Sequence, residues 1–212
     1  MTHSLHRLGD TEDLFDDFTI ICMSARGYND IGSQEKLRRF LRLAIKHNAV
    51  NFGNMEAGSA LVIDPEEVIG AIKDGTTVQA TFTSEQDFFN IVKDLVEEDL
   101  GMSVIIQGLT DKVHECCKQA GVEPHTWNNS LGVWGRTDLL PPKEIMEITT
   151  MCGHGMVAVS LVKKVIKDIK SGKIDYAKGV QILAKPCVCG FINPVRVARI
   201  LRRIIEEDKI EL

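Results

Sequence analysis

The order of apolar runs and amphipathic stretches in this 212-residue sequence predicts an α+β protein whose elements follow an α/β-like order. The first part is expected to be a ferredoxin-like open sheet with helices, because strand and helix patterns alternate up to about residue 109. The second part is expected to be helical, because helical periodicity alone continues after residue 143. We therefore divide the chain into an N-terminal arm at 1–17, a ferredoxin-like α/β domain at 18–140 and a helical, cysteine-rich, metal-binding domain at 141–212.

Strands are predicted at 18–25, 60–63, 76–82 and 103–109, with helices at 33–47, 64–75, 84–100 and 110–121. These helices are too few to cover both faces of a large sheet, so we expect them on one face. Asp64, Pro65 and Glu67 combine a capping box with proline at the first helical position, which marks a helix start. Ser33 is expected to cap the first helix, and Gly75 to end the second.

Two stretches rich in glycine and asparagine, 24–33 and 51–60, are interpreted as connecting loops, since neither contains a complete phosphate-binding pattern. The segment from 122 to 143 is expected to be irregular, because it combines paired asparagines, glycines and prolines with both tryptophans. Trp127, Trp134 and the loop 128–132 are expected to shield a site at the junction of the two parts. Four helices are predicted after it, at 144–151, 157–172, 176–184 and 194–208.

The composition argues against a nucleic-acid-binding surface, a secreted protein and a membrane protein. Hydrophobic residues make up 44% of the chain and the formal net charge is −5, which argues against a broad surface for nucleic acid. The sequence has neither a signal-peptide pattern nor an apolar stretch long enough for a membrane span, so we expect a cytoplasmic protein with no membrane partner. In that reducing compartment six cysteines are interpreted as metal ligands, reactive thiols or core residues rather than as disulfides. Cys22, inside an apolar strand pattern, is expected in the core.

Three cysteines share one setting, just before a predicted helix. Cys152 lies in MCGHG, and Cys187 and Cys189 lie in PCVCG, which is followed by Asn193 as a helix cap and by Pro194. Free backbone N–H groups and the positive end of a helix dipole favour the thiolate there. Because the stretch between Cys152 and Cys187 holds two helices, both turns are expected to return to the same end of the helical part.

Three thiolates with one open position suit a [4Fe–4S] cluster, and the fourth ligand is expected to be Cys117, Cys116, His154 or an external molecule. Three thiolates with His154 suit structural zinc instead. The spacing matches neither common zinc ribbons nor bacterial ferredoxins. Without a metal, Cys187 and Cys189 are best interpreted as a thiol pair for redox or sulfur-transfer chemistry, and the roles of His3 and His6 stay open.

The sequence therefore predicts a metalloprotein, with an iron–sulfur cluster as the first choice and zinc as the alternative. It would serve redox or metallocofactor-assembly chemistry in an oxygen-poor cell, since oxygen degrades accessible thiolates. The expected partner is a redox or cofactor-assembly protein, and a homo-oligomer is compatible with an exposed sheet face. The alternative function is a non-catalytic, ligand-sensing or oligomerising ferredoxin-like module with a zinc-stapled or thiol-lined helical tail. The sequence assigns no catalytic residue or substrate.

Overall fold

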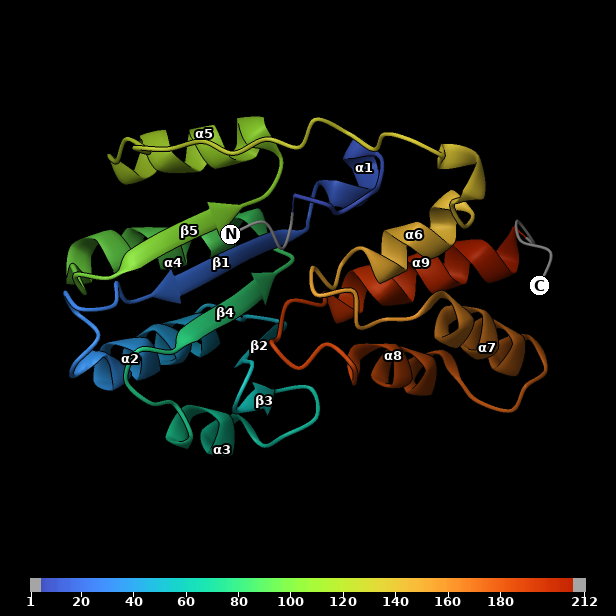
Figure 1. Ribbon diagram of the computed structural model, residues 1–212, viewed down its shortest axis with the longest axis horizontal. Helices are drawn as coiled ribbons and strands as arrows, with labels where there is room; N and C mark the ends of the chain where they lie inside the picture. Colours follow the sequence, from blue (N-terminus) through green and yellow to red (C-terminus); the bar gives the residue numbers. More distant parts are fainter. Residues whose placement is uncertain (1–4, 208–212) are drawn as a thin grey trace.

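The computed structural model describes residues 5–207, which form a mixed α+β protein (Figure 1). A five-stranded antiparallel sheet has the order β3-β2-β4-β1-β5 and is followed along the chain by packed helices α6–α9. The strands are β1 (Phe18–Met23), β2 (Asn51–Asn54), β3 (Gly58–Ser59), β4 (Thr77–Phe82) and β5 (Ser103–Gln107). Because β1 lies between β4 and β5, the strand that begins the sheet is an interior one and β5 is an edge.

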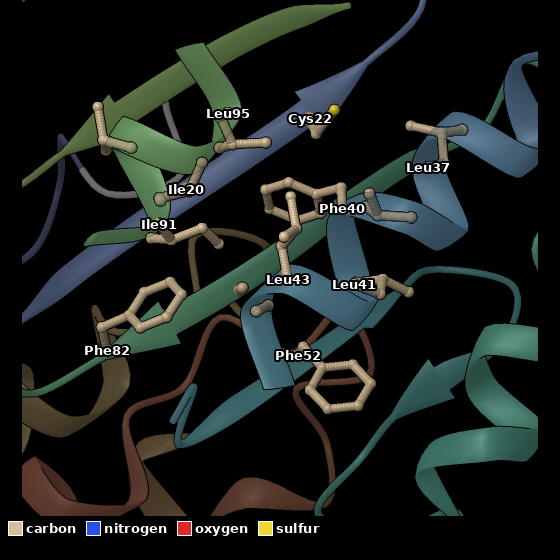
Figure 2. Close-up of a cluster of buried hydrophobic side chains, with 14 of the residues drawn as sticks. Ile20, Cys22, Leu37, Phe40, Leu41, Leu43, Phe52, Phe82, Ile91 and Leu95 are labelled. Carbon is tan, nitrogen blue, oxygen red and sulfur yellow. The ribbon is translucent and has the colours of Figure 1, made fainter. Parts of the chain in front are cut away.

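One face of the sheet carries helices whose apolar stripes form the first core cluster. These helices include α2 (Ser33–Lys46), α3 (Pro65–Gly70), α4 (Glu85–Glu98) and α5 (Thr110–Ala120). Ile20 and Cys22 of β1 belong to the same cluster of buried side chains as Phe40 of α2 (Figure 2). Cys22 is fully buried, so its predicted place in the core is confirmed.

A second core cluster joins the C-terminal helices to the sheet. It is built from α6 (Lys143–Thr149), α7 (Val159–Lys170), α8 (Tyr176–Ala184) and α9 (Pro194–Glu206), which lie toward one end of the strands in Figure 1. Successive strand residues face opposite sides, so Ile21 of β1 belongs to this cluster, whereas its neighbours belong to the first. Two short helices, α1 (Thr11–Leu14) and the 3-10 helix Thr137–Leu139, complete the order. Within residues 5–207 no helix has both the length and the apolar content needed to cross a bilayer.

The strand predicted at 60–63 is wrong, because the strand of this region is β2, inside the stretch interpreted as a loop. All four residues of β2 are buried, although two of them are asparagines. Asn51 donates to the carbonyl oxygen of Ile192 at 2.9 Å and accepts from the hydroxyl of Ser59 at 2.8 Å. Tertiary hydrogen bonds therefore stabilise a strand whose sequence carries no alternating apolar pattern.

Two predicted helix boundaries also differ. Gly32, with φ of +76°, occupies the cap position of α2, while Ser33 is the first helical residue and donates its hydroxyl to the carbonyl of Asp30. Helix α3 ends at Gly70 rather than Gly75. Its predicted start is confirmed, because the side chain of Asp64 accepts from the backbone N–H groups of the first turn.

The turn that carries Cys187 and Cys189 lies directly against the sheet. The hydroxyl of Thr81 donates to the carbonyl of Gly190 at 3.1 Å. Gly190 has φ of +83°, and a Cβ there would lie 2.3 Å from the carbonyl carbon of Phe52. Only glycine fits, since the backbones of two segments far apart in sequence meet with no room for a side chain.

Gly190→Ala is expected to destabilise the protein strongly. The left-handed backbone costs about 1–2 kcal/mol for an L-residue, and overpacking against β2 adds about 1–3 kcal/mol. Gly172→Ala is the matched control, because Gly172 has φ of +72° but nothing within 4 Å of an added Cβ. Denaturant midpoints of both variants measure the difference, and equal losses would contradict the close approach.

Candidate functional site

Cys152, Cys187 and Cys189, here called the thiol group, come together from two turns. Cys152 lies between α6 and α7, whereas Cys187 and Cys189 lie between α8 and α9. The sulfur atoms of Cys187 and Cys189 are 4.0 Å apart, and Cys152 is hydrogen-bonded to Cys187. The exposed fraction of each residue is 2% or less. The structure thus brings together the three sulfurs as their placement in sequence predicted, while their role as ligands stays a prediction.

His154 joins the thiol group on its solvent side. Its Nδ1 atom lies 3.6 Å from the sulfur of Cys189, and the residue itself is exposed. Gly155, with φ of +67°, turns the chain just after it, and its N–H donates to the carbonyl of Cys152 at 2.9 Å. The contacts therefore run from Cys152 through Cys187 and Cys189 to an imidazole at the surface.

Backbone amides surround the sulfur atoms. The N–H groups of His154 and Met156 donate to Cys152, and that of Phe191 donates to Cys189. Helix α9 fixes the second turn, because the side chain of Asn193 accepts from the first amides of the helix and Pro194 occupies its first turn. Short turns before helices thus supply donors that stabilise thiolates, as we predicted from the sequence.

The three thiols nevertheless differ in acidity. The hydrogen bond to Cys187, together with burial, raises the pKa of Cys152. The bond from Cys152 lowers the pKa of Cys187, but its own bond to Cys189 and its burial outweigh this and raise the value to about 12. The bond from Cys187 lowers the pKa of Cys189 below its ordinary value. The expectation of a favoured thiolate therefore holds for Cys189 and is wrong for the other two, because hydrogen bonding to a neighbouring sulfur and burial favour their protonated forms.

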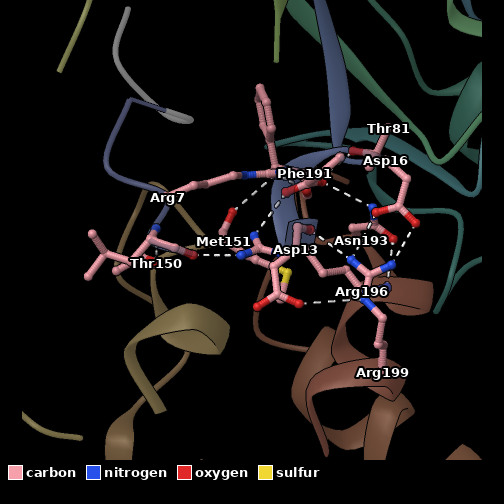
Figure 3. Close-up of polar contacts among 12 residues, drawn as sticks. Arg7, Asp13, Asp16, Thr81, Thr150, Met151, Phe191, Asn193, Arg196 and Arg199 are labelled. Carbon is pink, nitrogen blue, oxygen red and sulfur yellow. Dashed lines mark hydrogen bonds and ion pairs between the residues drawn. The ribbon is translucent and has the colours of Figure 1, made fainter. Parts of the chain in front are cut away.

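A buried ion-pair network holds the two cysteine turns in place (Figure 3). Arg7 of the N-terminal arm donates to the carbonyl oxygens of Phe191 and, at 3.4 Å, of Met151. Asp17 accepts from Arg7 at 2.5 Å and from Arg196 at 3.0 Å. Burial opposes the ionisation of Asp17, but the two guanidinium groups outweigh it and hold its pKa below the usual value. The residue before Cys152 and the residue after Gly190 therefore bind the same cation.

Sequence reasoning missed this network. Arg196 belongs to a basic run, 196–203, whose sequence pattern is typical of a solvated helix face, yet it is fully buried. The side chain of Asn193, expected only as a cap, also donates to Asp17 at 3.0 Å. Arg7 and Asp17 carry no local pattern that distinguishes them from other charged residues of the arm, and 10 residues separate them along the chain.

Cys117 does not join the thiol group. It lies on α5 and lines a cavity beside β5, and its neighbour Cys116 belongs to the first core cluster. His6 is exposed in the N-terminal arm, and His3 lies outside the described residues. The predicted shield is also wrong, because Trp134 is 82% exposed and Trp127 makes an edge contact with His114. The second core cluster buries the sulfurs instead.

The ligand atoms of the thiol group lie farther apart than those that surround a single metal ion. In residues 5–207 the one set of three ligand atoms that all lie within 4.8 Å of one another belongs to Asp10, Asp13 and Glu147. Those carboxylates are ion-paired with Arg203 and Lys143, so they form a charge network rather than a vacant site. Tetrahedral zinc with Zn–S distances of about 2.3 Å holds its sulfurs about 3.8 Å apart in every pair.

Comparison of the chain with protein-family models, with curated proteins and with solved structures found no match. Three sulfurs with amide donors and an imidazole at the surface can bind a metal or a cluster, or can exchange thiols and disulfides.

Asp17→Asn is expected to destabilise the protein by about 3–5 kcal/mol, because it leaves Arg7 and Arg196 buried without their carboxylate. The pKa of Asp17 is depressed in the folded state, so its contribution is present above the unfolded value near 4 and is lost as pH falls through the folded value. The difference in stability between wild type and variant should therefore shrink in acid. Asp138→Asn, which breaks an exposed pair with Arg136, is the control and should leave the denaturation midpoint unchanged.

In reduced, metal-free protein at pH 7, alkylation is expected to modify Cys189 before Cys187, because the pKa of Cys189 is lowered and that of Cys187 is raised to about 12. His154→Ala should speed this reaction by uncovering the sulfur. Cys22, whose pKa burial raises to about 12, should react only on unfolding. Peptide mapping by mass spectrometry measures the order, and earlier labelling of Cys187 or Cys22 would contradict it.

Proposed function

We propose that the thiol group holds a [4Fe–4S] cluster through the thiolates of Cys152, Cys187 and Cys189. His154 or an external molecule would occupy the fourth position, on the exposed side. The observation that carries the proposal is the meeting of three buried sulfurs from two glycine-containing turns, with backbone N–H groups directed at them. Such donors stabilise cluster thiolates and adjust their reduction potential.

The electrostatics of the site also favour a bound cation. Hydrogen bonds between the sulfurs and burial, with repulsion between thiolates as a smaller cause, hold the pKa values of Cys152 and Cys187 above the ordinary value. Positive charge on bound iron would remove that repulsion and release protons as it binds. No three ligand atoms of the thiol group and His154 all lie within 4.8 Å of one another. This wider spacing suits a centre with several metal ions better than a single ion.

When bound, the cluster would supply one-electron transfer or a site for cofactor assembly. The protein would position the cluster and shield it. Arg7 holds the two cysteine turns together, backbone N–H groups donate to the sulfurs, and the second core cluster excludes water. This chemistry favours a redox or cofactor-assembly partner protein, an oxygen-poor cell and a cytoplasmic location.

We further propose that the sheet part is ferredoxin-like. The strands β2-β4-β1-β5 are antiparallel neighbours, and α2 and α4 connect β1 to β2 and β4 to β5. That order of four strands and two crossover helices supports the finer fold assignment, with domains at 18–140 and 141–212. The fold by itself carries no function.

Structural zinc is the second candidate, as part of a non-catalytic module. The separations of 4.0 Å between Cys187 and Cys189 and of 3.6 Å between Cys189 and His154 favour it, since each suits one edge of a tetrahedral site. A small movement of Cys152 and His154 would bring all four ligand atoms to the spacing of a tetrahedral zinc site.

Anaerobic purification followed by an absorption spectrum and by iron, sulfide and zinc analysis distinguishes the candidates. We expect a brown protein with iron and acid-labile sulfide near four of each per chain. Cys152→Ser, Cys187→Ser and Cys189→Ser should each lose most of the iron, whereas Cys117→Ser and Cys22→Ser should retain it. One zinc per chain without sulfide would favour the second candidate, and protein free of both metals would overturn the proposal.

A further inference from the structure

We propose that a cavity beside β5 binds a small, uncharged heteroaromatic molecule. The cavity has a volume of about 330 Å³ and lies between β5, α5 and the segment 124–129. Its residues are distinct from the thiol group, so this site does not depend on the proposed metal function. A volume of this size falls at the lower end of the range for small-molecule pockets.

Several side chains that line the cavity are apolar. One wall of the cavity is β5, which is an edge strand of the sheet. Val104, Ile106 and Val113 contribute hydrophobic surface. Strand β5 pairs with β1 alone, so alternate backbone N–H and C=O groups of β5 point away from the sheet without a strand partner among the described residues. Such a wall offers donors and acceptors in a row next to apolar surface. A flat molecule with polar edges fits both properties.

The polar side chains of the lining favour a neutral ligand. Gln107, Asn128 and Asn129 line the cavity, and the carboxamide of each of the two asparagines carries a donor and an acceptor side by side. This pair is complementary to the edge of a purine or of a similar lactam or amidine ring. Among the described residues that line the cavity there is no Asp, Glu, Lys or Arg, although 26% of the chain is charged. A charged ligand would find no carboxylate, ammonium or guanidinium counter-ion in this lining.

Trp127 supplies an aromatic surface at the mouth of the cavity. It lines the cavity and is 43% exposed, and its ring is held by an edge contact with His114 at a centroid distance of 3.9 Å. An indole fixed in this way can stack on a heteroaromatic ring, an interaction worth about 1–3 kcal/mol per ring. An extended peptide added to β5 would compete for the same backbone edge. Residues 124–129 line the cavity together with β5, so an added strand would have to displace them.

Fluorescence titration of the Trp134→Phe variant tests the proposal, because Trp127 is then the sole tryptophan of the chain. Adenosine and lumichrome are the neutral probes, adenosine 5′-monophosphate is the charged comparison, and a capped tetrapeptide of alternating valine and threonine tests strand addition. We expect saturable quenching by at least one neutral probe, with the monophosphate binding no more tightly than adenosine.

Val104→Phe should weaken binding at least tenfold by filling the cavity. Ser103→Phe is the matched control, because Ser103 is exposed on the same strand and does not line the cavity. It should leave binding unchanged. Quenching by neither neutral probe, equal loss in both variants, tighter binding of the monophosphate, or binding of the peptide alone would each overturn the proposal. Iron content is measured in parallel, so failure of this site is distinguishable from failure of the metal proposal.

Discussion

The buried carboxylate of Asp17, paired with Arg7 and Arg196, is the interaction on which the arrangement of the two halves depends. Charges this deeply buried are tolerated only when they are paired. The Nη2 atom of Arg7 donates to the backbone carbonyls of Met151 and Phe191, and that of Arg196 donates to the carbonyl of Leu8. The Nε atoms of both arginines are buried without a hydrogen-bond partner among the described residues. A single charge cluster thus connects the arm, the start of β1, the start of α9 and both cysteine turns. It joins the two cysteine turns, because Met151 beside Cys152 and Phe191 beside Gly190 both accept from Arg7.

The electrostatics of the sulfurs oppose the fold around them. Burying Cys152, Cys187 and Cys189 side by side gains apolar contacts, but hydrogen bonding, burial and repulsion between thiolates raise the pKa values of Cys152 and Cys187, and only the pKa of Cys189 lies below its ordinary value. A bound metal centre would convert this repulsion into attraction and would add its binding free energy to that of folding. Turns that contain glycine and direct backbone N–H groups at the sulfurs suit a site that accepts an additional group. The exposed imidazole of His154 marks the side from which that group, or a partner, would approach.

The sequence predicted those features that depend on neighbours in the chain. Helix starts at Asp64 and Asn193 follow from side chains that cap amides two or three residues away, and the turns before α7 and α9 follow from glycine and proline. It failed where distant residues decide the outcome. Strand β2 consists of buried residues including two asparagines, and it forms because Asn51 finds partners in β3 and in the second cysteine turn. Arg196 has the local pattern of a surface residue, and only the distant Asp17 makes its burial favourable. Cys117 was expected as one candidate for the fourth ligand, whereas the fold places it in the lining of the β5 cavity.

The candidate metal centre therefore belongs to the contact between the two parts of the chain rather than to the helical part alone. Gly190 meets the backbone of Phe52, Thr81 binds the carbonyls of Gly190 and Phe191, and Ile21 of β1 belongs to the same core cluster as the sulfurs. The sheet is the wall that removes water from the second turn, and the arm that precedes the sheet holds both turns together. Helices α6–α9 without that wall would leave the carbonyls of the turn unpaired and the thiols exposed to water. A group bound by the three sulfurs would therefore bind only when both parts of the chain are folded together, because residues from both parts position its ligands.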